Sequence, residues 1–84
     1  MTTPARTVHV QYYAILREQA GRSSETLTTA AATPAELYAE LAGRRGLRLA
    51  REHLKVAINA EFGDWHAPLS DNDSVVFIPP VAGG

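Results

Sequence analysis

The chain has 84 residues, the length of one small domain. Its 8 Lys and Arg residues nearly balance 9 Asp and Glu residues, and 45% of its residues are hydrophobic. This balance argues against a general nucleic-acid binder and against attachment to an anionic membrane by charge alone. Cysteine is absent, which excludes disulfides, thiolate metal sites and cysteine nucleophiles.

Other classes of site lack their sequence signals. The chain has no apolar run long enough for a membrane helix and no apolar stretch near its start typical of a secretory signal, so we expect a cytoplasmic protein. The glycines match no phosphate-binding loop, and the histidines stand apart from other metal ligands: His9, His53 and His66. We therefore expect no metal site and no bound cofactor.

The first half of the chain predicts two strands around a short helix. Alternating polarity predicts a half-buried strand from Thr7, whose inward residues are Val8, Val10 and Tyr12. Residues 14–21 change to helical spacing and end on Gly21, and the inward residues of this short helix are expected to be Ile15, Leu16 and Ala20. The threonine-rich residues 25–30 predict a second strand, antiparallel to the first.

The clearest local signal starts the main helix. Thr33 is suited to cap it, Pro34 fits its first position, and Glu36 completes a capping box. This amphipathic helix is expected to end near Gly43 or Gly46.

The second half predicts a connector and three more strands. Residues 46–54 form the connector, residues 55–59 a strand, residues 62–65 a short strand, residues 67–73 a loop and residues 74–78 the last strand. The fold expected is α+β: a mixed sheet of four to five strands packed on one main helix, with a short helix after the first strand. The first and last strands carry the most inward apolar residues, so we expect them side by side and parallel at the centre.

The whole chain, 1–84, is expected to form a single domain with a frayed start at residues 1–6 and an extended tail at residues 79–84. In the tail, Pro79 and Pro80 fix the backbone in an extended path, and Gly83 and Gly84 follow without side chains. Such a slender tip fits a narrow channel and presents the α-carboxylate, which is ionised at neutral pH. An ionised carboxylate resists nucleophiles, so a partner enzyme has to activate it, for example as an acyl-adenylate.

An arginine cluster allows two interpretations: Arg44, Arg45, Arg48 and Arg51. It either meets phosphate or an acidic partner, or it forms a solvated helix end where positive charge complements the helix dipole. The near-neutral net charge favours the second interpretation.

Several segments together resemble the small, sulfur-carrier subunit of molybdopterin synthase, a ubiquitin-like β-grasp family. The most specific is the tail from Phe77 to Gly84, with the pattern Phe-x-Pro-Pro-Val-x-Gly-Gly. The other matching segments are Val10–Gly21, with Leu-Arg-Glu after the first strand, then Thr33–Leu37, Val56–Asn59 and Pro68–Asp73.

The resemblance implies a specific role for the tail. An adenylating partner would charge Gly84 with AMP from ATP, and a sulfur donor would convert it to a thiocarboxylate. Gly83 and Gly84 would then enter the large synthase subunit, where the sulfur passes to cyclic pyranopterin monophosphate. Two carriers would flank a dimer of large subunits, giving a heterotetramer. The chain would supply no catalytic side chain of its own, and ATP would serve only the activating partner.

The resemblance and the strand phases also suggest a docking surface. Tyr13 and Ile78 fall on the outward phase of the first and last strands, and Phe62 and Arg17 stand where the family places further partner contacts. The tail residues that would enter the partner complete this set: Pro79, Pro80, Val81 and Ala82. Two alternatives stay open: Phe62 as a core residue, and Arg17 as a solvated helix residue.

Three rival functions share the same tail. The first is a sulfur carrier for thiamine or cysteine synthesis, although the thiamine carrier usually lacks the helix expected at residues 14–21. The second is a protein modifier joined to lysines through Gly84. The third is a β-grasp interaction module whose tail has no chemical role.

Overall fold

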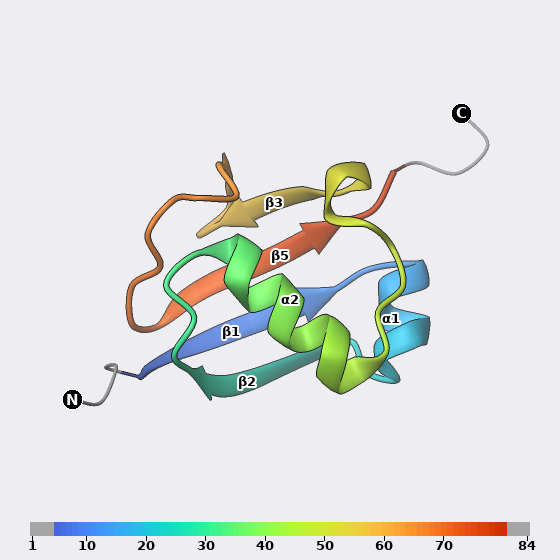
Figure 1. Cartoon of the computed structure of the whole chain (residues 1–84), viewed down its shortest axis with the longest axis horizontal. Helices are drawn as coiled ribbons and strands as arrows, with labels where there is room; N and C mark the ends of the chain where they lie inside the picture. The colour runs from blue at the N-terminus through green and yellow to red at the C-terminus, as the bar shows by residue number, and fades with distance from the viewer. Residues whose placement is uncertain (1–4, 81–84) are drawn as a thin grey trace.

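The sheet has five strands, within the four to five expected from the sequence. The structure, a computed structural model, describes residues 5–80. The strands are β1 (Arg6–Tyr12), β2 (Ser24–Thr29), β3 (Lys55–Ile58), β4 (Glu61–Gly63) and β5 (Asp73–Ile78). Their order across the sheet is β2-β1-β5-β3-β4. β1 and β5 are parallel neighbours at the centre, and the other pairs are antiparallel. The predicted placement of the first and last strands is therefore confirmed (Figure 1).

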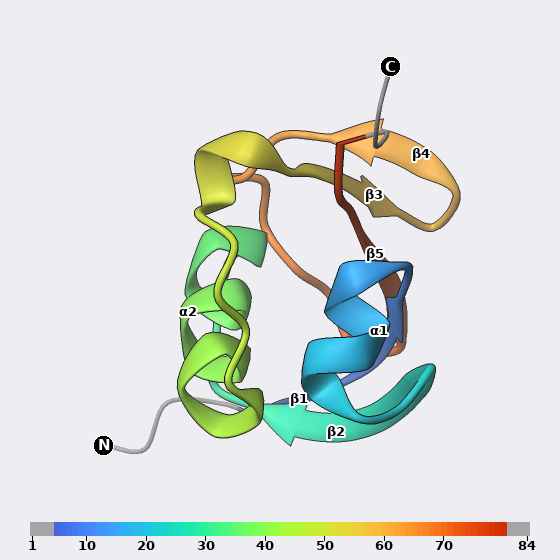
Figure 2. The same ribbon diagram turned by 90° about the vertical axis from the view of Figure 1, so that its right-hand side faces the viewer.

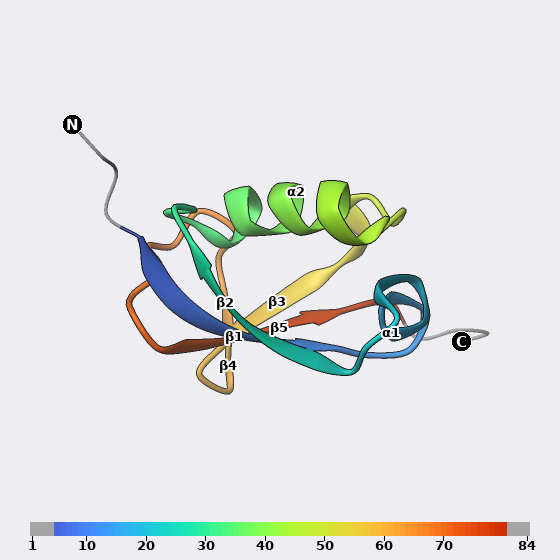
Figure 3. The same cartoon turned by 90° about the horizontal axis from the view of Figure 1, so that it is seen from below.

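One main helix covers one side of the sheet. α2 (Pro34–Arg45) lies above the strands, and no helix of residues 5–80 covers their other side (Figure 3). The Thr33 hydroxyl accepts a hydrogen bond from the Glu36 amide at 3.3 Å, and Gly46 ends the helix with φ 72°. The capping signal therefore predicted the start of α2 correctly, and of the two glycines expected near its end, Gly46 is the stop.

Residues 5–80 also form two shorter helices. α1 (Ile15–Ala20) follows β1 and ends at Gly21, as predicted. It lies at the end of the sheet where β1 and β5 finish (Figures 1 and 2). The 3₁₀ helix η1 (Arg51–His53) interrupts the connector before β3, and no separate signal in the sequence predicts it.

The core lies between the sheet and α2. Its largest fully buried side chains come from β1, β5, α1 and α2: Tyr12, Phe77, Leu16, Leu37 and Leu41. Val8, Val10 and Tyr12 all face inward, so the predicted alternation along β1 is confirmed.

Three details differ from the sequence-based expectations. Ile15, expected to face inward, is 41% exposed, because α1 is so short that only Leu16 on it is fully buried. Arg6, assigned to a frayed start, pairs with Thr29 in the sheet and donates a hydrogen bond to the Ala31 carbonyl. The short strand after β3 ends at Gly63 and does not reach Trp65.

Trp65 instead packs against the core beside α2. Its ring stacks on Phe77 at 5.8 Å between centroids and meets Tyr38 edge-on at 6.0 Å. The Tyr38 hydroxyl donates to the Leu49 carbonyl at 2.7 Å and so ties the connector to α2. Arg51 lies over the Trp65 ring at 5.8 Å.

The arginine cluster has structural contacts at the end of α2. Arg45 binds Glu25 at 2.6 Å, and Arg44 lies 3.4 Å from Glu40. With Arg51 over Trp65, these contacts support the helix-end interpretation of the cluster over a phosphate site.

The hairpin between β3 and β4 gives a stability prediction. Asn59 and Ala60 form its two-residue loop with φ 52° and 72°, the pattern of a type I′ turn, which favours Gly at the second position. Alanine in this conformation costs about 1 kcal/mol or more. We expect Ala60→Gly to raise the free energy of unfolding by about 1 kcal/mol, measured by urea denaturation.

The matched control is Ala39→Gly on the exposed side of α2, where glycine is expected to lower stability by about 1 kcal/mol. Equal effects of the two substitutions would contradict the assignment of this turn.

Candidate functional site

An apolar strip crosses the open face of the sheet next to the end of β5. Phe62 is opposite Ala57, Ala57 is opposite Val76, and Ile78 is one pleat further along β5. Because side chains alternate along each strand, these four residues project from the face opposite α2. We call Ala57, Phe62, Val76 and Ile78 the apolar strip. Its position agrees with the outward phase predicted for Ile78.

Phe62 is the most exposed large hydrophobic residue described, with 75% of its surface accessible. The alternative that placed it in the core is therefore wrong. The Lys55 ammonium lies 5.8 Å from the centre of its ring, and Lys55 is opposite Ile78 on β3. The strip thus places one exposed aromatic ring and one cation side by side, which makes it a candidate protein interaction site.

Two more predicted docking residues lie at this end of the molecule. Tyr13 directly follows Tyr12, which is opposite Phe77, so Tyr13 reaches the level of Ile78; it is 45% exposed. Arg17 is exposed on α1. Exposure leaves both residues accessible to a partner, and their role in docking stays a prediction.

A groove of about 380 Å³ marks the start of the tail. One wall is the segment from Glu52 to Lys55, and the other is formed by Ile78, Pro79 and Pro80. It adjoins the apolar strip, because Ile78 belongs to both. The remaining predicted tail residues, Val81, Ala82, Gly83 and Gly84, lie outside the described residues, and their roles stay predictions.

A network of charged and polar side chains holds the end of β1 to β2 and α2. The Glu25 carboxylate is 7% exposed; it accepts hydrogen bonds from Tyr12 at 2.6 Å and from Arg45 at 2.6 and 3.1 Å. Burial raises the pKa of Glu25, but the hydrogen bonds and charge of its partners outweigh burial and hold it below its ordinary value. Burial and the neighbouring carboxylate raise the pKa of Tyr12. The network fixes the strand end that precedes Tyr13.

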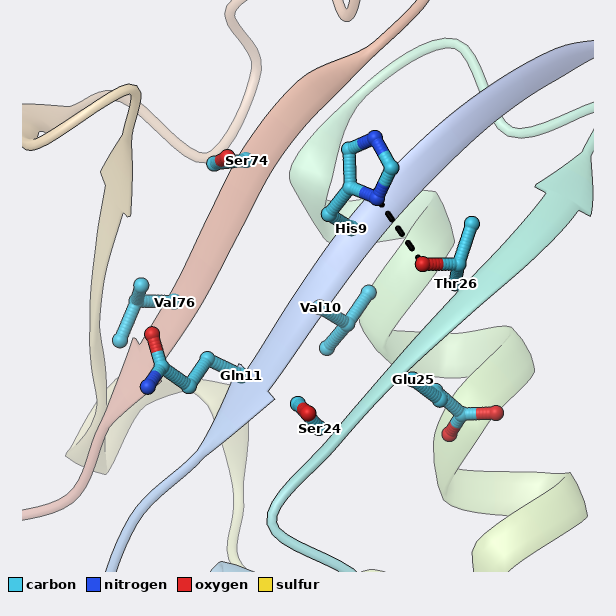
Figure 4. A pocket seen from close by; sticks show the side chains of 8 residues that line it. All are labelled: His9, Val10, Gln11, Ser24, Glu25, Thr26, Ser74 and Val76. Atoms are coloured by element: carbon cyan, nitrogen blue, oxygen red, sulfur yellow. Dashed lines mark hydrogen bonds between the residues drawn. The ribbon is translucent and has the colours of Figure 1, made fainter.

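The other half of the open face is polar. A shallow depression of about 360 Å³ lies over β2, β1 and β5, and Figure 4 shows His9, Gln11, Thr26 and Ser74 around it. Among residues 5–80, no three His, Asp or Glu side chains come together in a way that could hold a metal ion. The depression offers hydrogen bonding without a cluster of charge.

Three residues of the apolar strip and its border were not identified from the sequence. Ala57 and Val76 have the same outward phase as Ile78, so alternation along their strands could have identified them. Lys55 has no such signal, because its place over Phe62 depends on the tight turn between β3 and β4.

Known proteins resemble the chain over nearly its whole length. A family profile described as the ThiS family matches residues 10–84. A search by sequence among curated proteins gives no significant match. None of the described helices has the length and apolar character needed to cross a bilayer.

Solved structures share the fold. A putative molybdopterin converting factor subunit 1 from Pyrococcus furiosus is 26% identical, with TM-score 0.74 and coverage of 90% of this chain and 99% of that chain. A complex of subunits 1 and 2 of the molybdopterin-converting factor from Helicobacter pylori contains a chain that is 29% identical, with TM-score 0.63 and coverage of 93% and 99%. Small archaeal modifier protein 1 from Methanosarcina acetivorans has TM-score 0.77 and coverage of 96% and 99%; at 20% identity it supports the fold alone.

The α+β fold expected from the sequence is therefore confirmed as the ubiquitin-like β-grasp, with a five-stranded mixed sheet. The family profile covers most of the chain, and the resemblance noted in the sequence agrees with it. The chain belongs to the ThiS family of ubiquitin-like sulfur carriers.

Proposed function

We propose that this chain is the sulfur carrier of molybdenum cofactor biosynthesis and acts as the small subunit of molybdopterin synthase. The observation that carries the proposal is the apolar strip with the exposed Phe62, directly beside the end of β5, from which the tail pattern Phe-x-Pro-Pro-Val-x-Gly-Gly continues. The similarity to two molybdopterin-converting factor subunits supports it. α1 also supports it over the thiamine carrier, which usually lacks a helix at this place.

In this proposal the reacting group is the α-carboxylate of Gly84. The activating enzyme joins this carboxylate to AMP from ATP and releases pyrophosphate. A sulfur donor then displaces AMP and leaves a thiocarboxylate. Inside the large subunit, the sulfur passes to cyclic pyranopterin monophosphate. The activating enzyme and the large subunit both bind the folded domain of the carrier. Their contacts include Tyr13, Arg17 and the apolar strip.

Phe62 gives the sharpest test of docking. Exposed aromatic residues often supply much of the binding energy of an interface, so we expect Phe62→Asp to weaken binding to the large subunit by more than about tenfold. Its free energy of unfolding should change by less than about 1 kcal/mol, because the side chain is exposed. Isothermal titration calorimetry measures the affinity, and urea denaturation measures the stability.

Ser74→Asp is the matched control, because it adds the same charge to the polar half of the same face. Equal binding by the Phe62 variant and the native chain would remove the apolar strip from the docking surface. Ile78→Lys should weaken the complex in the same way.

A modifier function has the same requirements for the tail, so the acceptor of the acyl group distinguishes the two. Lys55 is the chain's single lysine, and other proteins would supply further acceptor amines. Amide-linked conjugates in place of sulfur transfer would favour the modifier function.

A further inference from the structure

The fold separates charges that the sequence balances. The net charge of the chain is −1, and residues 5–80 hold all 8 Lys and Arg residues. Arg6 alone among these cations lies at the end of the sheet where β1 and β5 begin, and Asp71 and Asp73 lie there too. The other cations lie toward the opposite end, where β1 and β5 finish (Figure 1): the arginine cluster, Arg17, Arg22 and Lys55. A nearly neutral chain therefore has one positive end.

Four cations at this end have no counter-charge within the described part of the chain. Glu25 pairs with Arg22 and Arg45, and Glu40 pairs with Arg44. The remaining four are exposed and form no ion pair within residues 5–80: Arg17, Arg48, Arg51 and Lys55. We call these four residues the basic rim. The aromatic rings next to Arg51 and Lys55 carry no charge, so they do not neutralise these two cations.

The basic rim lies where the chain leaves the sheet. Its residues come from four segments: Arg17 from α1, Arg48 from the connector, Arg51 from η1 and Lys55 from the start of β3. The Arg48 amide donates to Gln19 Oε1 at 2.8 Å and so ties the connector to α1. Figure 2 looks onto this end of the molecule, where α1, the connector and η1 face the viewer. The dipole of α2 acts only near its last turn, so it does not account for Arg17 or Lys55.

The chemistry of the rim favours an acidic protein surface over a phosphate ligand. The four cations belong to separate segments, and the exposed carboxylates of Glu18 and Glu52 stand among them. These two carboxylates would repel a polyanion, whereas a protein surface can place cations opposite them. The rim also adjoins the groove at the start of the tail through Lys55, which lines it, and Lys55 borders the apolar strip. Charged groups around an apolar centre are the usual arrangement of a protein interface.

We propose that the protein that receives the tail carries an acidic surface around its entrance, and that the basic rim attracts and orients this surface. Opposite charges speed the association of two proteins and align them before contact. Alignment matters for this chain because a slender tail has to meet a narrow entrance. The choice of the large subunit as the partner rests on the proposed function.

The acidic surface has to be confined to the entrance, because it would repel the ionised carboxylate of the tail deeper in the channel. Four residues follow Pro80, and when extended they span about 14 Å. This length exceeds the Debye length of about 8 Å at physiological ionic strength. The carboxylate of an inserted tail is therefore screened from charges at the entrance, and attraction of the rim does not oppose insertion.

The salt dependence of association tests the proposal. Stopped-flow mixing of the native chain with dye-labelled large subunit measures the association rate constant. It should fall by at least about tenfold between about 0.02 M and about 0.5 M NaCl, because salt screens exposed charges. The dissociation rate constant should change by less than about threefold, since charges at the edge of an interface act mainly on association.

Substitutions in the rim should reproduce the effect of salt. At low ionic strength, we expect Arg17→Gln and Arg48→Gln each to slow association by about threefold, and Arg48→Lys to restore the rate because it keeps the charge. Arg48 binds Gln19 through its backbone amide, so these changes leave that hydrogen bond in place. Ser74→Asp is the control: it makes the same change in net charge near the start of β5, and it should associate like the native chain.

Two results overturn the inference and leave the proposed function intact. The first is a complex that forms at the same rate at both salt concentrations and with all variants. The second is binding of ATP to the isolated chain with a dissociation constant below about 1 mM, seen as shifts of the Arg17 and Arg48 amide signals, since the rim would then be a phosphate site. Absence of any complex at either salt concentration overturns both the inference and the proposed function.

Discussion

Deleting Gly84 is expected to reduce sulfur transfer by at least about 100-fold, because it withdraws the carboxylate that we propose to react by about one residue length, roughly 3.5 Å. Adding one residue after Gly84 should abolish transfer, since the carboxyl group that would be activated becomes an amide. Thermal unfolding should be the same in all three chains, because the described core is built from residues between Val8 and Phe77. Dithiolene formation with the large subunit measures the transfer, and intact mass reports the thiocarboxylate.

The matched control carries the additional residue at the start of the chain and should keep full activity. Dithiolene formation by the truncated chain at the native rate would remove Gly84 from the mechanism and the sulfur-carrier proposal with it.

Glu25→Gln is expected to lower the free energy of unfolding by about 2–3 kcal/mol. The substitution keeps the size of the side chain but removes the charge that Arg45 and Tyr12 bind in a nearly buried position. For a domain of this size, each kcal/mol corresponds to a Tm shift of about 4–8 °C. Urea denaturation with an unchanged m-value would show that stability alone has changed. Glu18→Gln on the exposed side of α1 is the control, with an expected change below about 0.5 kcal/mol.

The effect should depend on pH. The folded pKa of Glu25 lies below its ordinary value of 4.5, so its ionised form stabilises the fold above that pH. This contribution is lost as the pH falls below 4.5 and through the folded pKa. The difference in stability between the native chain and the Glu25→Gln variant should therefore shrink in acid. A difference that stays constant from neutral to acidic pH would contradict an ionic origin.

The fold could be predicted largely because its signals are local. The Thr33 cap and Gly46 stop act within one turn of α2, and the alternation along β1 directly reports which face is buried. The parallel pairing of β1 and β5 followed from their apolar content and from the helix between them. The cap, the stop and the alternation need no knowledge of distant contacts, and the pairing of β1 with β5 needs only a general rule of strand connection.

The features that were missed depend on distant contacts. Trp65 is held by Phe77 and Tyr38, which are far from it in sequence, and Ile15 is exposed because α1 is too short to bury it. The turn at Asn59 and Ala60 adopts positive φ without the glycine that normally signals it.

The candidate site was predictable to the same extent. The alternation along β5 correctly placed Ile78 on the open face of the sheet. For Phe62 the sequence left a core position and an exposed position open, and the structure shows that its side chain is exposed. Lys55 belongs to the site because the register of the β3–β4 hairpin places its ammonium group over the Phe62 ring, a contact that the sequence does not indicate. The roles of Gly83 and Gly84 rest on the sequence pattern and the family, so experiment has to test them.

The most direct test follows one sulfur atom. The chain is activated with its adenylating enzyme, ATP and a sulfur donor, then mixed with the large subunit of molybdopterin synthase and cyclic pyranopterin monophosphate. Intact mass spectrometry should first show the increase expected when one oxygen is replaced by sulfur, and then its loss as the pterin dithiolene forms. A thiocarboxylate that persists in the presence of this acceptor, or a chain that never gains sulfur, would contradict the proposed function.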